Sequence, residues 1–263
     1  MLLNIKLIFL FLLCWWSSVS AESLNVAVAS NFTQPMRQLI AEFEDSVVGL
    51  DKSQEHRINL ISGSSGKLFA QIVNGAPYDL FFSADQEKVE RLIRLDLAKL
   101  DSRLTYANGR LVMWTKNAKT KITEKNLSLE RFKKIALANA KLAPYGKAAE
   151  SVLHKLNLEA SVREKLVYGE NINQTFQFVN SENAQAGFVA LAQIVKLPEA
   201  EQGSYWLVPE HYHQPIAQDA IILRRAQSKA KAEKFLQFIQ SQNAQKIIKA
   251  YGYRLAKEPC DVE

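Results

Sequence analysis

Cysteine is scarce in this chain, which has only Cys14 and Cys260. Cys14 lies in an N-terminal segment that we expect to be removed, and a single remaining cysteine cannot form an intrachain disulfide. Leu12 and Leu13, rather than small residues, precede Cys14, which argues against a lipid anchor there. The fold must be held by its hydrophobic core, and about 240 residues suffice for one large or two ordinary domains.

Long apolar runs are also absent, except at the N-terminus. Residues 7–16 form an apolar run after Lys6, and the small residues of Val19-Ser20-Ala21 follow. The run is about half of the roughly 20 apolar residues that a transmembrane helix needs. This pattern predicts a signal peptide at residues 1–21, cleaved near Ala21, and therefore an exported, periplasmic protein.

A large excess of one charge is missing as well. The formal net charge is +6, and it falls to +5 when residues 1–21 are removed, because Lys6 is their only ionisable side chain. The remaining lysines and arginines are scattered among acidic residues at helical spacing. They indicate solvated helix faces, and we expect no nucleic-acid partner.

Motifs for metal binding or nucleophilic catalysis are not found. His211 and His213 could share one face of a strand, as zinc ligands do, but no third ligand is evident, so no metal site is expected. Cys260 could be paired with His154 or His56 as a nucleophile and base. A cysteine in a polar C-terminal tail cannot preorganise such a site.

Two acidic residues leave an enzyme open as an alternative. Asp79 and Asp85 flank the strand-like run 78–83 and could act as an acid and base in an exported α/β enzyme. Strand-end carboxylates more often bind backbone groups, and no Gly-x-Ser-x-Gly or His-Glu-x-x-His motif accompanies them. We therefore expect no catalytic residues.

The patterns that are present alternate between strand and helix. Strands are predicted at residues 24–29, 57–61, 78–83, 110–114, 135–138, 186–190 and 216–223, and helices at 32–43, 67–73, 147–156, 175–180 and 230–251. This order predicts an α/β fold with two lobes, each a mostly parallel sheet flanked by helices. Residues 22–108 and 213–263 are expected to form lobe 1 and residues 109–212 lobe 2, with two crossover strands as the hinge near 106–109 and 211–214.

Small polar turns recur where predicted helices begin. They are Ser30-Asn31, Ser62-Gly63-Ser64-Ser65-Gly66, Pro144-Tyr145-Gly146 and Gly169-Glu170-Asn171-Ile172-Asn173. The first N–H groups of a helix have no intrahelical acceptor and lie at the positive end of its dipole, so they can bind anions without a cationic side chain. Each turn could equally be only a helix cap. Together they predict an anion site at the sheet edge.

These stretches resemble the periplasmic molybdate-binding proteins of ABC importers. The similar segments are Val26 to Phe32, Ser62 to Leu68, Asn74 to Asp85, Ala143 to Gly146, Gly187 to Leu191 and Tyr251-Gly252-Tyr253. The resemblance spans nearly the whole chain after residue 21, and the run from Gly75 to Asp85 is its most specific element.

The resemblance implies a monomer of two lobes that close on a tetrahedral dianion held by neutral donors. Carried over by position, the donors are Ser30, Asn31, Ser65, Tyr145 and Ile172. It further implies a membrane permease as partner, molybdate or tungstate as ligand, and no cofactor. Some members have a ligand-contacting tyrosine where this chain has Ala190, which leaves the number of donors open.

Donor chemistry adds a rule of selectivity. A cavity lined by N–H groups without acceptors rejects protonated anions such as phosphate, whereas only cavity size separates sulfate from molybdate. A receptor for sulfate or another oxyanion, an α/β enzyme and an interaction protein without a small ligand remain as alternative hypotheses.

Overall fold

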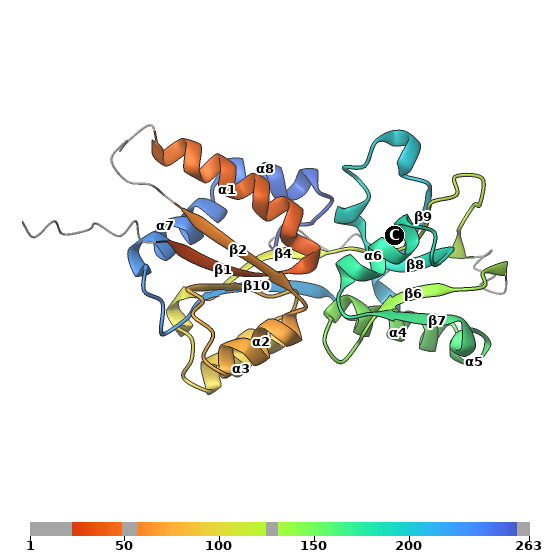
Figure 1. Ribbon diagram of the computed structural model, residues 1–263, viewed down its shortest axis with the longest axis horizontal. Helices are drawn as coiled ribbons and strands as arrows, with labels where there is room; N and C mark the ends of the chain where they lie inside the picture. Colours follow the sequence, from red (N-terminus) through yellow and green to blue (C-terminus); the bar gives the residue numbers. More distant parts are fainter. Residues whose placement is uncertain (1–22, 49–56, 125–130, 257–263) are drawn as a thin grey trace, which may run out of the picture.

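The computed structural model describes residues 23–48, 57–124 and 131–256. The predicted signal peptide, Cys14 and Cys260 lie outside these ranges. Figure 1 shows two lobes side by side, each built around a sheet, with extended chain running between them. In the described ranges no helix combines the length and the apolar character that a membrane crossing requires.

The sheet of the first lobe draws its strands from both ends of the chain. In spatial order it contains β2 (Ile58–Gly63), β1 (Leu24–Ala29), β3 (Leu80–Phe82), β10 (Ile216–Ile222) and β4 (Leu104–Gly109). β1 pairs in parallel with β2 and β3, and β10 pairs antiparallel with β3 and β4.

The sheet of the second lobe comes from the middle of the chain. It contains β7 (Leu166–Gly169), β6 (Ile135–Ala138), β8 (Ala186–Ala190), β5 (Leu111–Thr115) and β9 (Ser204–Leu207), in that order. β6 pairs in parallel with β7 and β8, and β5 pairs antiparallel with β8 and β9.

The predicted two-lobed α/β fold is confirmed, with one refinement. Each sheet is mixed rather than mostly parallel, because one strand beside the crossings, β10 in the first sheet and β5 in the second, runs against the others. Only Arg110 separates β4 in one sheet from β5 in the other, and the chain returns between Leu207 and Ile216. The lobe boundaries at 108/109 and 212/213 stay a prediction.

Helices cover both faces of each sheet (Figure 1). Around the first sheet lie α1 (Thr33–Val48), α2 (Ser65–Val73), α3 (Glu87–Arg94), α7 (Lys229–Ile239) and α8 (Gln242–Ala250), and around the second α4 (Pro144–Lys155), α5 (Glu159–Val162) and α6 (Ile172–Asn180). In β1, Val26 and Val28 pack into one hydrophobic cluster and Ala27 into another. Burial on both faces explains why these strands are continuously apolar.

The predicted C-terminal helix 230–251 is two helices. The break falls at Ser241, whose Oγ accepts the backbone N–H of Ala244 at 3.2 Å and so caps α8. A serine inside an otherwise helical pattern competes for backbone N–H groups and favours a new helix start. The periodicity alone did not indicate this break.

Phe235 offers a test of how α7 is held on the first sheet. Its side chain is fully buried and packs edge-on against Phe43, with ring centroids 5.1 Å apart. We expect Phe235→Ala to lower the free energy of unfolding by roughly 3–5 kcal/mol in a urea titration. The matched control is Leu100→Ala, which removes a side chain that is 66% exposed and should change stability by less than about 0.5 kcal/mol. Equal effects would contradict this account of the core.

Candidate functional site

The four predicted helix starts lie together where the lobes meet. The backbone N–H of Gly66, in the first turn of α2, donates to the carbonyl of Leu142, just before α4, at 2.9 Å. Lys67 Nζ of α2 lies 2.6 Å from Glu170 Oε1, just before α6. Helix α6 also packs against the short 3-10 turn η1 (Ser30–Phe32), which follows β1. The site therefore combines two helix starts from each lobe.

At η1, the side chain of Asn31 is already committed to other protein groups. Its Nδ2 donates to Gln218 Oε1 at 2.9 Å and to the hydroxyl of Tyr253 at 3.0 Å. These two bonds use both amide hydrogens, so the donor that Asn31 has left is its backbone N–H. Ser30 precedes it and is 5% exposed. The hydroxyl of Ser30 has no hydrogen-bond partner among the described residues.

At α2, neighbouring groups satisfy all but one of the first N–H groups. The N–H of Gly66 donates to Leu142, and that of Lys67 donates to the Oγ of the N-cap Ser64. The N–H of Ser65 has no acceptor within the described chain. Ser65 Oγ accepts the N–H of Ala84 at 2.9 Å, which fixes the oxygen and leaves its hydrogen available to donate. Ser65 can thus provide two donors.

The start of α4 leaves one N–H group in the same way. Pro144 has no N–H, and those of Gly146 and Lys147 both donate to the carbonyl of Ala143. Only the N–H of Tyr145 remains without an acceptor among the described residues.

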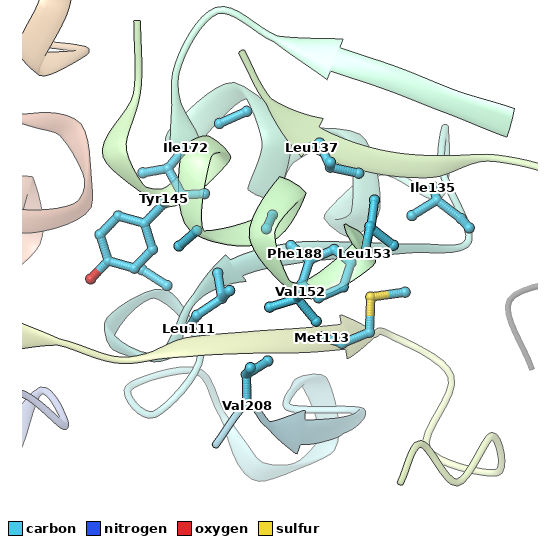
Figure 2. Close-up of a cluster of buried hydrophobic side chains, with 14 of the residues drawn as sticks. Leu111, Met113, Ile135, Leu137, Tyr145, Val152, Leu153, Ile172, Phe188 and Val208 are labelled. Atoms are coloured by element: carbon cyan, nitrogen blue, oxygen red, sulfur yellow. The ribbon is translucent and has the colours of Figure 1, made fainter. Parts of the chain in front are cut away.

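At α6, the side chain of Asn171 caps the helix by accepting the N–H groups of Asn173 and Gln174. The N–H of Thr175 donates to the carbonyl of Asn171. The N–H of Ile172 is the one for which the described part of the chain supplies no acceptor. Figure 2 shows Tyr145 and Ile172 at the same end of the hydrophobic cluster of the second lobe.

The phenol of Tyr145 points away from that cluster, toward the first lobe (Figure 2). Gln218 Nε2 lies 3.4 Å from its oxygen. Burial raises the pKa of the Tyr145 hydroxyl above its ordinary value, so it remains a neutral phenol. The structure thus places this hydroxyl against Gln218.

Three side chains that support the site were not predicted. Gln218 and Tyr253 hold Asn31, and Gln193 holds the start of α6 by donating from Nε2 to Asn173 Oδ1 at 2.8 Å. Gln193 Oε1 also accepts the N–H of Ala190 at 3.0 Å. Tyr253 lies in a segment that carried the family resemblance, but nothing in the sequence indicated its partner. A glutamine in a strand or turn gives no such signal.

The five predicted residues carry no formal charge. Their side chains are buried, with 1–5% exposed. Two ion pairs between charged side chains join the lobes near these residues. Besides Lys67 with Glu170, Lys147 Nζ of lobe 2 lies 4.0 Å from Glu87 Oε2 of lobe 1. The partners of both pairs are about half exposed or more, so each contributes little free energy.

The histidine pair is not on a strand as predicted. His211 lies in the 3-10 turn η8 (Glu210–Tyr212) after Pro209, and His213 follows it. His213 is 6% exposed, and burial lowers the pKa of its imidazole. No group of three or more His, Cys, Asp or Glu side chains in the described ranges could hold a metal ion.

The two aspartates of the enzyme hypothesis bind backbone groups. Asp79 is 2% exposed, and its two oxygens accept the N–H groups of Asn25 and Gln227, each at 2.7 Å. Asp85 Oδ1 accepts the N–H of Lys88 at 2.9 Å. Both carboxylates therefore have the structural role that strand-end acids usually have.

Two α/β lobes whose helix starts meet at their junction are an arrangement suited to binding a small solute. Residues 24–254 match the family described as bacterial extracellular solute-binding protein, and the chain belongs to this family. It is 39% identical over 241 residues to the molybdate-binding protein ModA of Azotobacter vinelandii, covering 90% of this chain and 92% of that protein. It is 35% identical to ModA of Rhodobacter capsulatus, covering 89% of each.

A solved structure agrees with these sequence comparisons. The periplasmic molybdate-binding protein of Azotobacter vinelandii superposes with a TM-score of 0.83 at 38% identity, covering 88% of this chain and 99% of that one. The family assignment identifies the chain as a solute-binding protein.

Asp79→Asn tests the structural role of this aspartate. The amide keeps one acceptor oxygen, while one of the two N–H groups now bound by the carboxylate faces an amide NH₂. We expect a loss of roughly 1.5–3 kcal/mol in the free energy of unfolding, measured by urea titration. Anion affinity should stay within about threefold of the parent. A loss of turnover with unchanged stability would instead restore the enzyme hypothesis.

Proposed function

We propose that this protein binds molybdate, and also tungstate, and delivers it to an ABC importer. The observation that carries the proposal is the pattern of free donors. The starts of α2, α4 and α6 each leave one N–H group, those of Ser65, Tyr145 and Ile172, without an acceptor in the part of the chain that the structure describes. The backbone N–H of Asn31 and the hydroxyls of Ser30 and Ser65 complete a set of donors from both lobes.

This donor set suits an anion without protons. Four of the six proposed donors are backbone N–H groups, which cannot accept a hydrogen bond, and Ser65 Oγ already accepts the N–H of Ala84. An O–H group of a protonated anion would face N–H donors and lose its own hydrogen bond, which is costly in a buried site. Phosphate, which carries a proton near neutral pH, is disfavoured for this reason.

Similarity supports molybdate over sulfate. Two relatives, ModA of Azotobacter vinelandii and ModA of Rhodobacter capsulatus, are molybdate-binding proteins that are 39% and 35% identical to this chain. Each alignment covers about nine tenths of the chain. A sulfate-binding protein from Mycobacterium tuberculosis has the same fold at a TM-score of 0.70, but its 12% identity supports the fold alone. Sulfate is the runner-up ligand, and size is what would exclude it.

We propose export and a membrane partner on the same grounds. Residues 1–21 have the pattern of a signal peptide, and the family is extracellular. The protein would act in the periplasm as a monomer, without a cofactor, and the closed pair of lobes would dock on the permease. Lobe 1 would comprise residues 22–108 and 213–263, and lobe 2 residues 109–212.

Isothermal titration calorimetry tests the ligand. Residues 22–263 should bind one molybdate or tungstate per chain, and sulfate at least about tenfold more weakly. Ser65→Ala should weaken molybdate binding by about 10- to 150-fold, because a hydrogen bond to a charged group contributes roughly 1.5–3 kcal/mol.

Ser64→Ala is the matched control. Ser64 caps α2 rather than facing the proposed anion, so its loss should cost about 1 kcal/mol of stability with little change in affinity. No heat with any of the three anions would refute the proposal, and tighter binding of sulfate would select the runner-up.

The pH dependence of binding provides a second test. Burial raises the pKa of Tyr106, Tyr145 and Tyr253 above the ordinary value of about 10, so these phenols stay neutral in the folded protein. Molybdate affinity should therefore change less than about twofold between about pH 7 and 9.

Above about pH 10 the unfolded chain ionises its tyrosines while the folded chain holds these three neutral, so stability should fall as pH rises. A titration step in affinity between pH 7 and 9 would show that an ionisable group has been missed.

A further inference from the structure

A buried network of amides and phenols joins the anion site to the junction of the lobes. It consists of Asn31, Tyr106, Tyr145, Gln218 and Tyr253, all of which are 0–4% exposed. Gln218 lies on β10 and Tyr106 on β4, the two strands of lobe 1 that lead to the crossings. Asn31 and Tyr253 also belong to lobe 1, and Tyr145 alone comes from lobe 2.

The donors and acceptors of this network have assigned directions. Gln218 Oε1 accepts from Asn31 Nδ2 and from the Tyr106 hydroxyl, each at 2.9 Å. Its Nε2 can then only donate, and the Tyr145 oxygen lies 3.4 Å away. Tyr253 accepts from Asn31 Nδ2 and donates to the carbonyl of Asn31 at 2.9 Å. The backbone of Asn31 is thus fixed by a chain of bonds that ends on Tyr145.

Gly109 makes room for the Tyr145 hydroxyl. It is the last residue of β4, next to the first crossing. A Cβ atom at this position would lie 2.1 Å from the Tyr145 oxygen and 2.7 Å from Gln218 Nε2, both far inside van der Waals contact. The absence of a side chain at Gly109 is therefore a condition for the phenol to reach Gln218.

We propose that the Tyr145 hydroxyl, seated on Gln218 against Gly109, couples closure of lobe 2 to the orientation of Asn31. This inference rests on the proposed oxyanion binding. Tyr145 then acts twice: its backbone N–H donates to the anion, and its hydroxyl completes the network only when the lobes are closed. Gln218, Tyr253 and Gly109 are positioning residues, since they act on the anion through Asn31 or Tyr145.

The coupling makes a prediction in which the effect of one substitution changes sign. Tyr145→Phe keeps the backbone donor and removes only the hydroxyl, so it should weaken molybdate binding by about 2- to 10-fold, the value of one neutral hydrogen bond. Gly109→Ala should weaken it further, because the methyl group and the hydroxyl cannot both fit. In the Gly109→Ala background, Tyr145→Phe should instead improve binding, because it removes the closest clash.

The measurement is the calorimetric dissociation constant of molybdate for the parent, the two single variants and the double variant. Urea titrations without anion show that each variant is folded. Tyr168→Phe is the matched control, since it removes a phenol from lobe 2 that is 52% exposed, and its affinity should equal that of the parent.

Two results would overturn the coupling while the parent still binds molybdate. One is a Tyr145→Phe variant with parental affinity, and the other is a double variant that binds more weakly than Gly109→Ala alone. A parent that binds no molybdate would refute the proposed function instead.

If Gly109→Ala does not fold, Tyr145→Phe combined with Gln218→Met decides. Tyr145→Phe should then add nothing to the loss caused by Gln218→Met, because the phenol acts on Asn31 only through Gln218. Gln218→Met alone should weaken binding more than Tyr145→Phe alone, since it also removes the acceptor of Asn31 Nδ2. Additive losses in that pair would count against the coupling.

Discussion

Removing a doubly charged anion from water is possible only if the protein replaces its hydration with fixed donors. In this chain the proposed donors come from helix starts, and their number is set by the capping groups around them. Ser64 and Leu142 occupy two N–H groups of α2, Ala143 occupies two of α4, and Asn171 occupies three of α6. Among the described residues, each helix start is left with a single N–H group that has no acceptor. The caps thus fix which donors remain as well as stabilising the helices.

This arrangement depends on the topology of both sheets. η1 follows β1 and α2 follows β2, while α4 and α6 follow β6 and β7, so each helix begins at the carboxyl end of a parallel strand. Ligands of open α/β sheets lie at that edge. The short crossing at Arg110 turns the two edges toward each other, and the antiparallel strands beside the crossings are the reason that both sheets are mixed. Neither lobe holds a full set of donors alone.

The strands and helix starts were predictable because their signals are local. The strands Ile135–Ala138 and Ala186–Ala190 have the predicted bounds, and a polar turn at 169–173 was predicted before α6, although the helix begins at Ile172 rather than at 175. The side chains that support the site were not predictable, because their partners are distant in sequence. Asn31 and Gln218 are 187 residues apart, and only the assembled sheet brings them together. His211 and His213 were misplaced because a local strand pattern missed the turn that Pro209 begins.

Ala190 shows how such distant contacts bear on the site. It is fully buried in the cluster that contains Tyr145 and Ile172, and its methyl group cannot donate a hydrogen bond. Its backbone N–H is held by Gln193, whose amide nitrogen also binds Asn173 in the first turn of α6. A chain without a phenol at this position depends more on the remaining N–H groups, and a donor contributes most when it need not reorient to bind. By tying the end of β8 to the start of α6, Gln193 keeps the N–H of Ile172 in place.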